Sequence, residues 1–430
     1  MAVRFDPTGP LRGVLRPPAD KSISHRAALI AAMGEGETTI EGYLDSADTR
    51  STLAAVQALG AEVEGVSATE VDPVIAVRGV GLRGAGSAKI DVGNAGTLLR
   101  LLPGWLAGQP GGSWTLDGDD SIRRRPVDRV AVPLRAMGAK LSCREDRLPP
   151  LEVEGAELKG IEHELPVASA QVKSCLLFAG LLAEGLTWVR EPARSRDHTE
   201  RMLAAAGADV AWLRGGVALR PPKRLALGEF AVPTDFSSAA FFIVAALLVP
   251  DSEVTLEGVG TNPTRTGLLT ILERMGAEIE VVPVGERGGE PVGTIRVRGS
   301  ALRGTEVGGA EIPLAIDELP MVALAACFAE GETTIRDAAE LRRKESDRVA
   351  TTCEALNALG ATAEPREDGI RIEGSGGLRG GAIESHGDHR IAMLGAVAGL
   401  ASGDGVEVEG MDAAAVSYPG FEADLASLLG

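Results

Sequence analysis

The sequence lacks the features of an exported or membrane-inserted protein. Its first residues, MAVRFDPTGPLRG, contain no apolar core of a signal peptide. No apolar run approaches the ~20 residues that a membrane-spanning helix needs. With 430 residues, of which 44% are apolar, the chain can nevertheless bury a sizeable core in two or three domains. The sequence therefore predicts a cytoplasmic globular protein with no membrane partner.

Cysteine is also scarce. The four cysteines, Cys143, Cys175, Cys327 and Cys353, form no C-x-x-C pair, and each lies inside or beside an apolar helical pattern. We expect reduced core residues rather than disulfides or metal ligands. No cluster of Cys and His suggests a metal site, so the prediction is no metal and no cofactor.

Basic residues are outnumbered by acidic ones, and aromatic residues are few. The net charge is −18, and aromatic residues make up only 3% of the chain. Surfaces that bind nucleic acids are normally basic, and many stack bases on aromatic rings. The composition therefore argues against a nucleic-acid partner, and any cations gathered in one place stand out against an acidic background.

What the chain does contain is an internal repeat. Each copy reads as a short alternating strand, a polar loop, an amphipathic helix, a glycine-containing helix stop and another strand. Ahead of each copy lies a second helix that is apolar on nearly every side, as helices in a core are. The sequence thus predicts an α/β fold of six βαβαββ-type modules. The six copies begin at Thr38, Trp114, Thr187, Val254, Thr333 and, in truncated form, Val406.

The repeat explains a glycine motif that resembles a dinucleotide fingerprint. Residues 79–84, GVGLRG, match G-x-G-x-x-G. Similar glycine turns occupy the same slot in other copies, at residues 155–160, 299–304 and 374–380. No long helix follows Gly84 directly. We therefore interpret this turn as architecture and not as a nucleotide site.

Polar residues collect at the starts of the six buried helices, near Asp20, Gly93, Ser169, Asp235, Ile316 and Gly387. Helix capping alone explains the Ser, Asp and Asn residues. It does not explain cations within the first two turns, because a positive side chain there opposes the helix macrodipole. If these helix ends face one cleft, they form a site for a polyanion. The cations are Lys21, Arg26, Arg100, Lys173 and Arg390.

The loops before the amphipathic helices add further charge, at residues 123–126, 196–198 and 342–348. A solvated charged surface is one interpretation of each loop. Glu345 and Asp317 differ, because a carboxylate in a cationic cleft has no purpose in anion affinity. Such a carboxylate can move a proton.

At this point the motifs resemble those of the 5-enolpyruvylshikimate-3-phosphate synthase family. K-S-x-S-x-R, G-N-A-G-T-x-x-R, R-P, S-A-Q-x-K-S, R-D-H-T-E, D-E, K-E-S-D-R and D-H-R-x-A-M follow one another in order along essentially the whole chain. The resemblance implies an inside-out α/β barrel arrangement of two three-module domains with substrates between them. It places residues 1–20 with 232–430 in one domain and 21–231 in the other, with chain crossings near 19–21 and 231–235.

The resemblance also implies an activity and a set of site residues. The enolpyruvyl group of phosphoenolpyruvate would pass to the 5-hydroxyl of shikimate 3-phosphate through a tetrahedral intermediate, with release of phosphate, in a monomer that needs no cofactor. The expected contacts to shikimate 3-phosphate are Ser22, Arg26, Ser169, Ala170, Gln171, Arg196, Asp317 and Lys344. Those to phosphoenolpyruvate are Lys21, Gly96, Arg125, Arg348 and Arg390, with Asn94 in the floor of that site. Asp317 is the candidate to accept the hydroxyl proton and Glu345 to carry the proton of the methylene carbon, supported by Lys21 and His389.

Two alternatives stay open at this point. The sister enolpyruvyl transferase that acts on UDP-N-acetylglucosamine shares the six-module architecture, although its first buried helix begins differently and it carries a reactive loop cysteine. A non-catalytic polyanion-binding module would explain the cations but not Asp317 and Glu345. Two further positions bear on phosphoenolpyruvate: Gly96 leaves space that favours sensitivity to the family's inhibitor glyphosate, and Val416 stands where some relatives have lysine.

Overall fold

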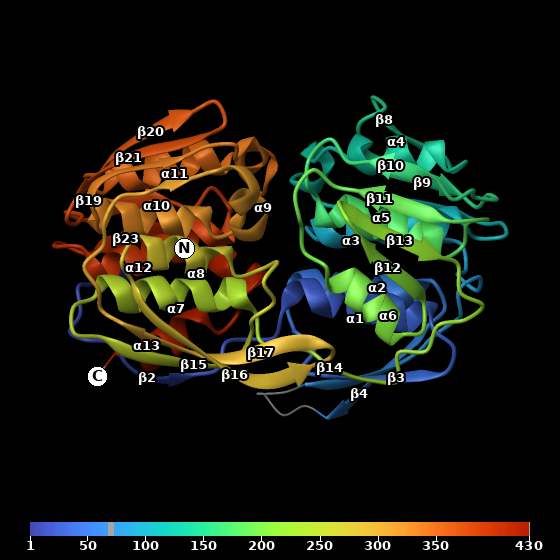
Figure 1. Cartoon of the computed structure of the whole chain (residues 1–430), viewed down its shortest axis with the longest axis horizontal. Coiled ribbons are helices and arrows are strands. Elements are labelled where there is room, and N and C mark those ends of the chain that lie inside the picture. The colour runs from blue at the N-terminus through green and yellow to red at the C-terminus, as the bar shows by residue number, and fades with distance from the viewer. Residues whose placement is uncertain (68–72, 430) are drawn as a thin grey trace. The chain divides into compact units, whose positions relative to one another are not determined.

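The computed structural model describes residues 1–67 and 73–429, and the chain divides into two compact units (Figure 1). Unit 1 comprises Met1–Pro18, Thr234–Gly285 and Pro291–Gly430. Unit 2 comprises Ala19–Pro233 and Glu286–Glu290. Each unit contains three small sheets, which confirms the predicted α/β class with six repeated modules.

The three sheets of unit 2 share one strand order. A short edge strand runs parallel to its neighbour, and two antiparallel strands complete the sheet. The sheets are β14 (Glu229–Ala231), β3 (Glu37–Glu41), β5 (Val74–Arg78), β4 (Glu62–Ser67); β6 (Ala88–Asp91), β7 (Ser113–Asp117), β9 (Leu148–Glu154), β8 (Lys140–Arg144); and β10 (Glu162–Glu164), β11 (Thr187–Arg190), β13 (Gly216–Arg220), β12 (Asp209–Leu213).

Two sheets of unit 1 repeat this order and the third is shorter. The sheets are β2 (Arg12–Leu15), β15 (Glu253–Gly260), β17 (Glu290–Arg298), β16 (Glu278–Arg287); β18 (Glu306–Val307), β19 (Glu330–Ile335), β21 (Gly369–Ser375), β20 (Thr362–Arg366); and β1 (Val3–Phe5), β23 (Val406–Glu409), β22 (Gly381–Glu384). Strand β1 pairs antiparallel with β23 and so completes the truncated last module.

Buried helices lie inside each unit, and the sheets lie outside them (Figure 1). Strands such as β3 and β7 bury alternate residues against these helices and leave the others exposed or half-buried. All six helices predicted to be apolar on every side are present and buried. They are α1 (Lys21–Met33), α3 (Gly96–Ala107) and α5 (Ala170–Gly180) in unit 2, and α7 (Phe236–Leu248), α10 (Leu319–Phe328) and α12 (His389–Ala401) in unit 1.

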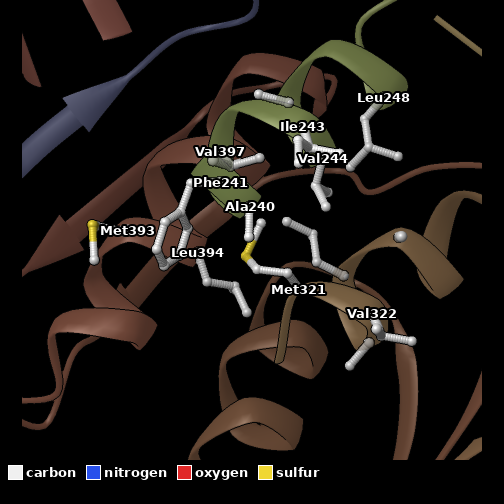
Figure 2. Packing of buried hydrophobic residues seen from close by; sticks show 14 of the residues in the cluster. Ala240, Phe241, Ile243, Val244, Leu248, Met321, Val322, Met393, Leu394 and Val397 are labelled. Carbon is white, nitrogen blue, oxygen red and sulfur yellow. The ribbon is translucent and has the colours of Figure 1, made fainter. Parts of the chain in front are cut away.

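The core of each unit is built where its three buried helices meet. Figure 2 shows part of the unit 1 core, in which Phe241 of α7, Met321 of α10 and Leu394 of α12 point toward one another. Half-buried amphipathic helices and short helical turns complete the modules. They are α2 (Ala47–Ala58), α4 (Asp128–Ala136), α6 (His198–Ala205), α8 (Gly267–Arg274), α9 (Ile312–Ala315), α11 (Arg348–Ala358), α13 (Phe421–Ser427), η1 (Ile122–Arg124), η2 (Gly309–Glu311), η3 (Ala339–Arg343) and η4 (Met411–Val416).

The recurring glycine turn packs against the C-terminal ends of the buried helices. A Cβ on Gly79 would lie 2.3 Å from the carbonyl oxygen of Ala31, and one on Gly374 would lie 2.1 Å from that of Ala329. A Cβ on Gly155 would lie 2.6 Å from backbone carbonyl oxygens after α3. No side chain fits such distances, so the glycines permit a close approach of two backbones. This geometry supports the interpretation of the motif as architecture.

A hairpin of strands β16 and β17 carries a segment of unit 2. Its tip, Glu286–Glu290, clusters with that unit. There the buried Glu290 Oε1 lies 2.8 Å from Nδ1 of His198, which is also buried, and Arg201 donates a hydrogen bond of 3.3 Å to the carbonyl of Gly289. Unit 2 is therefore completed by residues that are distant in sequence.

The described residues include no helix that is long and apolar enough to cross a membrane. Three cysteines, Cys175, Cys327 and Cys353, are buried and carry free thiols. The prediction of a core position is wrong for Cys143, which has a free thiol but is only half-buried. It lies on β8, a strand at the edge of its sheet in which even the inward-facing residues are only half-buried.

Candidate active site

The predicted site residues fall into two groups, one in each unit. The unit 2 group is Lys21, Ser22, Arg26, Asn94, Gly96, Arg125, Ser169, Ala170, Gln171 and Arg196. The unit 1 group is Asp317, Lys344, Glu345, Arg348, His389 and Arg390. Within each group the residues lie at the N-terminal ends of the buried helices or in the loops before the amphipathic helices.

Arg26 is buried in the second turn of α1 and is held by neutral oxygens. Its Nε donates to Oγ1 of Thr199 (2.7 Å), its Nη2 to Oγ of Ser174 (3.1 Å) and its Nη1 to the carbonyl of Ser22 (2.8 Å). Burial lowers the pKa of Arg26 to about 10, although nearby Glu200 acts in the opposite direction. The guanidinium is thus still charged at neutral pH and is oriented by groups that do not neutralise it, which suits it to an anionic ligand.

Arg125 lies against the N-terminus of α3. Its Nη2 donates to Oδ1 of Asn94 (2.7 Å) and to Oγ of Ser121 (3.2 Å), and Asn94 in turn donates to Asp119 (2.7 Å). A Cβ on Gly96, the first residue of α3, would lie only 2.7 Å from Nη1 of Arg125. The absence of a side chain at Gly96 therefore lets a guanidinium reach a helix N-terminus, where backbone N–H groups and the helix dipole already favour an anion.

Hydrogen bonds also connect α3 with α5. Arg100 donates to Oε1 of Gln171 (3.0 Å), and Gln171 donates to Oγ1 of Thr97 (3.2 Å). Ser169 is the N-cap of α5, where its hydroxyl accepts from the backbone N–H of Val172. At the start of α5, Ser169 therefore caps the helix, and Arg100 and Thr97 orient the side chain of Gln171.

Lys21, at the start of α1, forms an ion pair with the carboxylate of Asp48 (3.1 Å), and both side chains are mostly buried. This pair holds the ammonium at the N-terminal end of the helix.

In unit 1, the two candidate proton-transfer carboxylates share one arginine. Arg348 is buried at the start of α11, and its Nη2 lies 2.5 Å from Oε2 of Glu345. Its Nη1 lies 3.3 Å from Oδ1 of Asp317. The same oxygen forms an ion pair with Nζ of Lys344 at 3.1 Å. Arg390 donates to the backbone carbonyl of Asp317 (2.8 Å). The structure therefore brings these five residues together.

Comparison of the sequence with known proteins identifies the family of this chain. The family model described as EPSP synthase (3-phosphoshikimate 1-carboxyvinyltransferase) matches residues 5–425. The chain belongs to the EPSP synthase family.

Relatives of full length agree with this assignment. The 3-phosphoshikimate 1-carboxyvinyltransferase of Gloeobacter violaceus is 52% identical over 99% of this chain and 98% of that protein. That of Thermus thermophilus is 52% identical over 99% of each chain. A solved structure of EPSP synthase from Acinetobacter baumannii is similar with a TM-score of 0.86, 41% identity and coverage of 99% of this chain and 98% of that one. The family, enzyme class and fold predicted from the motifs are confirmed, and neither alternative function is favoured.

One residue of this EPSP synthase-family site was not predicted. Asp388 is fully buried at the N-cap of α12 and accepts from Arg348 through Nε (2.8 Å) and Nη2 (3.1 Å). Burial alone would raise the pKa of Asp388, but Arg348 holds it below its ordinary value. Ser346 also donates to this carboxylate (2.9 Å). Asp388 belongs to the D-H-R motif, but an aspartate at the start of a helix is already explained by N-capping, so the sequence did not indicate its contact with Arg348.

A second network in unit 1 was also missed. Arg265, buried in the loop before α8, donates to Oδ1 of Asp235 and to Oγ of Ser237, each at 2.8 Å. Its Nη1 lies 3.8 Å from Oε1 of Glu318, and Arg390 lies 3.6 Å from the same oxygen. Arg265 lies in the loop before the amphipathic helix, where other copies of the repeat also carry cations, and this correspondence could have predicted it.

Two further residues named from the sequence, His389 and Lys173, are also buried. His389 is the first residue of α12. Lys173, one of the cations expected to face a polyanion, instead binds carboxylates within unit 2. In the part of the chain that the structure describes, no group of His, Cys, Asp and Glu side chains is placed to hold a metal ion.

Proposed function

We propose that this chain transfers the enolpyruvyl group of phosphoenolpyruvate to the 5-hydroxyl of shikimate 3-phosphate and releases phosphate. Family membership over the whole chain supports the reaction. The observation that carries the residue roles is the position of Asp317 and Glu345 on either side of Arg348. Two carboxylates that share one guanidinium provide proton acceptors beside a fixed positive charge.

Shikimate 3-phosphate is proposed to bind through hydrogen-bond donors and cations from both groups. Arg26 supports this assignment best, because neutral oxygens orient its guanidinium and leave its charge for a ligand. The remaining proposed contacts are Ser22, Ser169, Ala170, Gln171, Arg196, Asp317 and Lys344.

Phosphoenolpyruvate is proposed to bind through Lys21, Gly96, Arg125, Arg348 and Arg390, with Asn94 supporting Arg125. The contact of Arg125 with the N-terminus of α3 supports this assignment, since a guanidinium and helix N–H groups together suit a phosphate or carboxylate.

The chemistry needs two proton movements. As the 5-hydroxyl oxygen attacks C2 of phosphoenolpyruvate, Asp317 accepts the hydroxyl proton, and C3 gains a proton to give the tetrahedral intermediate. Glu345 delivers the proton to C3 and takes one back when phosphate leaves. Lys21 and His389 support the developing charge. An anionic substrate group at Arg348 competes with Glu345 for the guanidinium, which raises the proton affinity of that carboxylate and favours its action as an acid.

We further propose that the enzyme is a cytoplasmic monomer whose only partners are these small molecules. The net charge of −18 opposes binding to nucleic acids, and four free thiols are consistent with a reducing compartment.

A phosphate-release assay tests the proposed reaction. Phosphate should appear only when the enzyme has both phosphoenolpyruvate and shikimate 3-phosphate, with one enolpyruvyl product formed for each phosphate. The same assay with UDP-N-acetylglucosamine in place of shikimate 3-phosphate should give none. Release with the UDP-sugar, or no release with shikimate 3-phosphate, would contradict the proposal.

A further inference from the structure

Lys173 is a buried cation that the proposed reaction does not use. It lies on α5, only 1% of its surface is exposed, and its ammonium contacts two carboxylates of unit 2. Nζ lies 2.8 Å from Oε1 of Glu200, on α6, and 3.0 Å from Oε1 of Glu191, just after β11. Burial alone would lower the pKa of Lys173, but the two carboxylates outweigh it and the pKa is raised. The side chain is therefore an ammonium enclosed by protein.

The carboxylates tie this ammonium to one loop, residues 191–197. Ser195 donates through Oγ to Oε2 of Glu191 (2.5 Å), and its carbonyl accepts from Nζ of Lys173 at 3.4 Å. The loop is thus held both at its first residue and at the residue that directly precedes Arg196. Arg196 is the loop residue assigned to shikimate 3-phosphate.

The other end of the loop is held by the same lysine. Glu200 lies in the first turn of α6, which begins directly after the loop at His198. Glu200 is 1% exposed, and its Oε2 has no hydrogen-bond partner in the part of the chain that the structure describes. Its Oε1 is bonded to the ammonium of Lys173, which compensates its charge. A buried carboxylate without such a partner is costly. Lys173 accordingly holds the first turn of α6 against α5, together with the hydrogen bond between Oγ of Ser174 and Oγ1 of Thr199 (2.6 Å).

We infer that Lys173 is a positioning residue, whose ion pairs with Glu191 and Glu200 fix the loop that carries Arg196 and thereby set the affinity for shikimate 3-phosphate. The inference rests on the proposed function, because it takes Arg196 as a substrate contact. Lys173 itself is enclosed by its carboxylates and acts without touching the substrate.

Calorimetric titration of shikimate 3-phosphate into the Lys173→Met variant is the first test. We expect the Kd to rise about tenfold or more, since a guanidinium displaced by about 1 Å loses much of its contribution. The KM of phosphoenolpyruvate, measured with saturating shikimate 3-phosphate, should change little. A folded Lys173→Met protein that binds shikimate 3-phosphate as the wild type does would overturn the inference.

A double-mutant cycle distinguishes an effect of Lys173 through Arg196 from a structural effect that does not involve Arg196. If Lys173 acts through Arg196, the Lys173→Met change should raise the Kd much less in an Arg196→Ala background than in the wild type. Equal effects in the two backgrounds would overturn the inference. If Arg196→Ala alone leaves the Kd unchanged while the enzyme still turns over, the assignment of Arg196 fails and the inference fails with it. A wild-type protein that does not bind shikimate 3-phosphate would instead refute the proposed function itself.

Removal of Lys173 leaves the carboxylates of the buried Glu200 and the half-buried Glu191 without their cation and can prevent folding, so a neutral variant is needed. Lys173→Met/Glu191→Gln/Glu200→Gln removes all three charges together, which is far less costly than breaking the ion pairs. This variant should melt near the wild-type temperature and still bind shikimate 3-phosphate about tenfold more weakly. The control is Leu59→Ala, a cavity substitution at the end of α2 in the same unit, which should lower the melting temperature without changing the Kd. Wild-type affinity in the neutral variant would mean that the lysine serves stability alone.

Discussion

The two units use the same module but place different chemistry at the starts of their buried helices. In unit 1 all three helices begin with a buried carboxylate, and each of these lies beside arginine. The three are Asp235, Glu318 and Asp388. In unit 2 only α1 begins with a carboxylate, Asp20, whereas α3 begins at Ala95 and Gly96 and α5 at Ser169.

This difference affects which groups hold the arginines of each unit. The arginines of unit 1 are held by carboxylates, so each cation there is largely compensated before any ligand arrives. Arg26 and Arg100 of unit 2 donate to hydroxyl, carbonyl and amide oxygens. The repeat therefore provides a frame, and the residues at the helix starts determine how far carboxylates compensate the arginines of each unit.

Glu345→Gln in unit 1 should lower turnover by roughly 10²-fold or more, the usual scale for loss of a general acid or base. Binding of shikimate 3-phosphate should stay nearly intact, because a carboxylate contributes nothing to affinity for an anion. Steady-state kinetics together with calorimetry measure both quantities. A decrease of less than tenfold would assign the proton transfer elsewhere, with Asp317 the next candidate.

Arg26→Met in unit 2 should act in the opposite way. Loss of a charge-assisted contact worth about 1.5–3 kcal/mol should raise the Kd of shikimate 3-phosphate by roughly 10- to 150-fold. Turnover with both substrates saturating should change far less. Since Arg26 is also bonded to Thr199 and Ser174, the melting temperature must be measured in parallel. A large decrease in turnover at saturation would show that Arg26 acts in the chemical step and not only in binding.

Gly96→Ala should raise the KM of phosphoenolpyruvate by several-fold. The new Cβ would lie 2.7 Å from Nη1 of Arg125, and the guanidinium, as the end of a flexible side chain, must move away. Loss of about 1 kcal/mol of a charge-assisted contact corresponds to this change. The matched control is Gly9→Ala, where no atom lies within 4 Å of the added Cβ and no effect is expected. An unchanged KM would show that Arg125 does not bind this substrate.

Val416→Lys should have the smallest effect, a decrease of a few-fold in the KM of phosphoenolpyruvate with little change for shikimate 3-phosphate. Val416 ends the helical turn η4 and is half-buried, so a lysine there gains less than about 1 kcal/mol from a partly solvated contact. Ala415→Lys, at the exposed neighbouring position, is the control. If the KM of phosphoenolpyruvate is unchanged or higher in a variant that still melts cooperatively, the position does not face the substrate.

Much of this architecture was predictable because it is local and repeated. The six buried helices follow from apolar residues on every side, and the glycine turns follow from their recurrence. Lys173 was not predictable, since its position in α5 does not tell which face it occupies, and its partners lie on a later strand end and helix. The contact between His198 and Glu290 joins residues 92 positions apart and depends on the full length of a hairpin. Long-range pairing of this kind leaves no local pattern.

A single-turnover measurement on enzyme saturated with both substrates separates the role of Arg26 from that of Glu345. The rate of the chemical step should be nearly the same in Arg26→Met as in the wild type, and roughly 10²-fold lower in Glu345→Gln. Equal losses in the two variants would show that Arg26 does not act through affinity alone, and would contradict the separate roles proposed for Arg26 and Glu345.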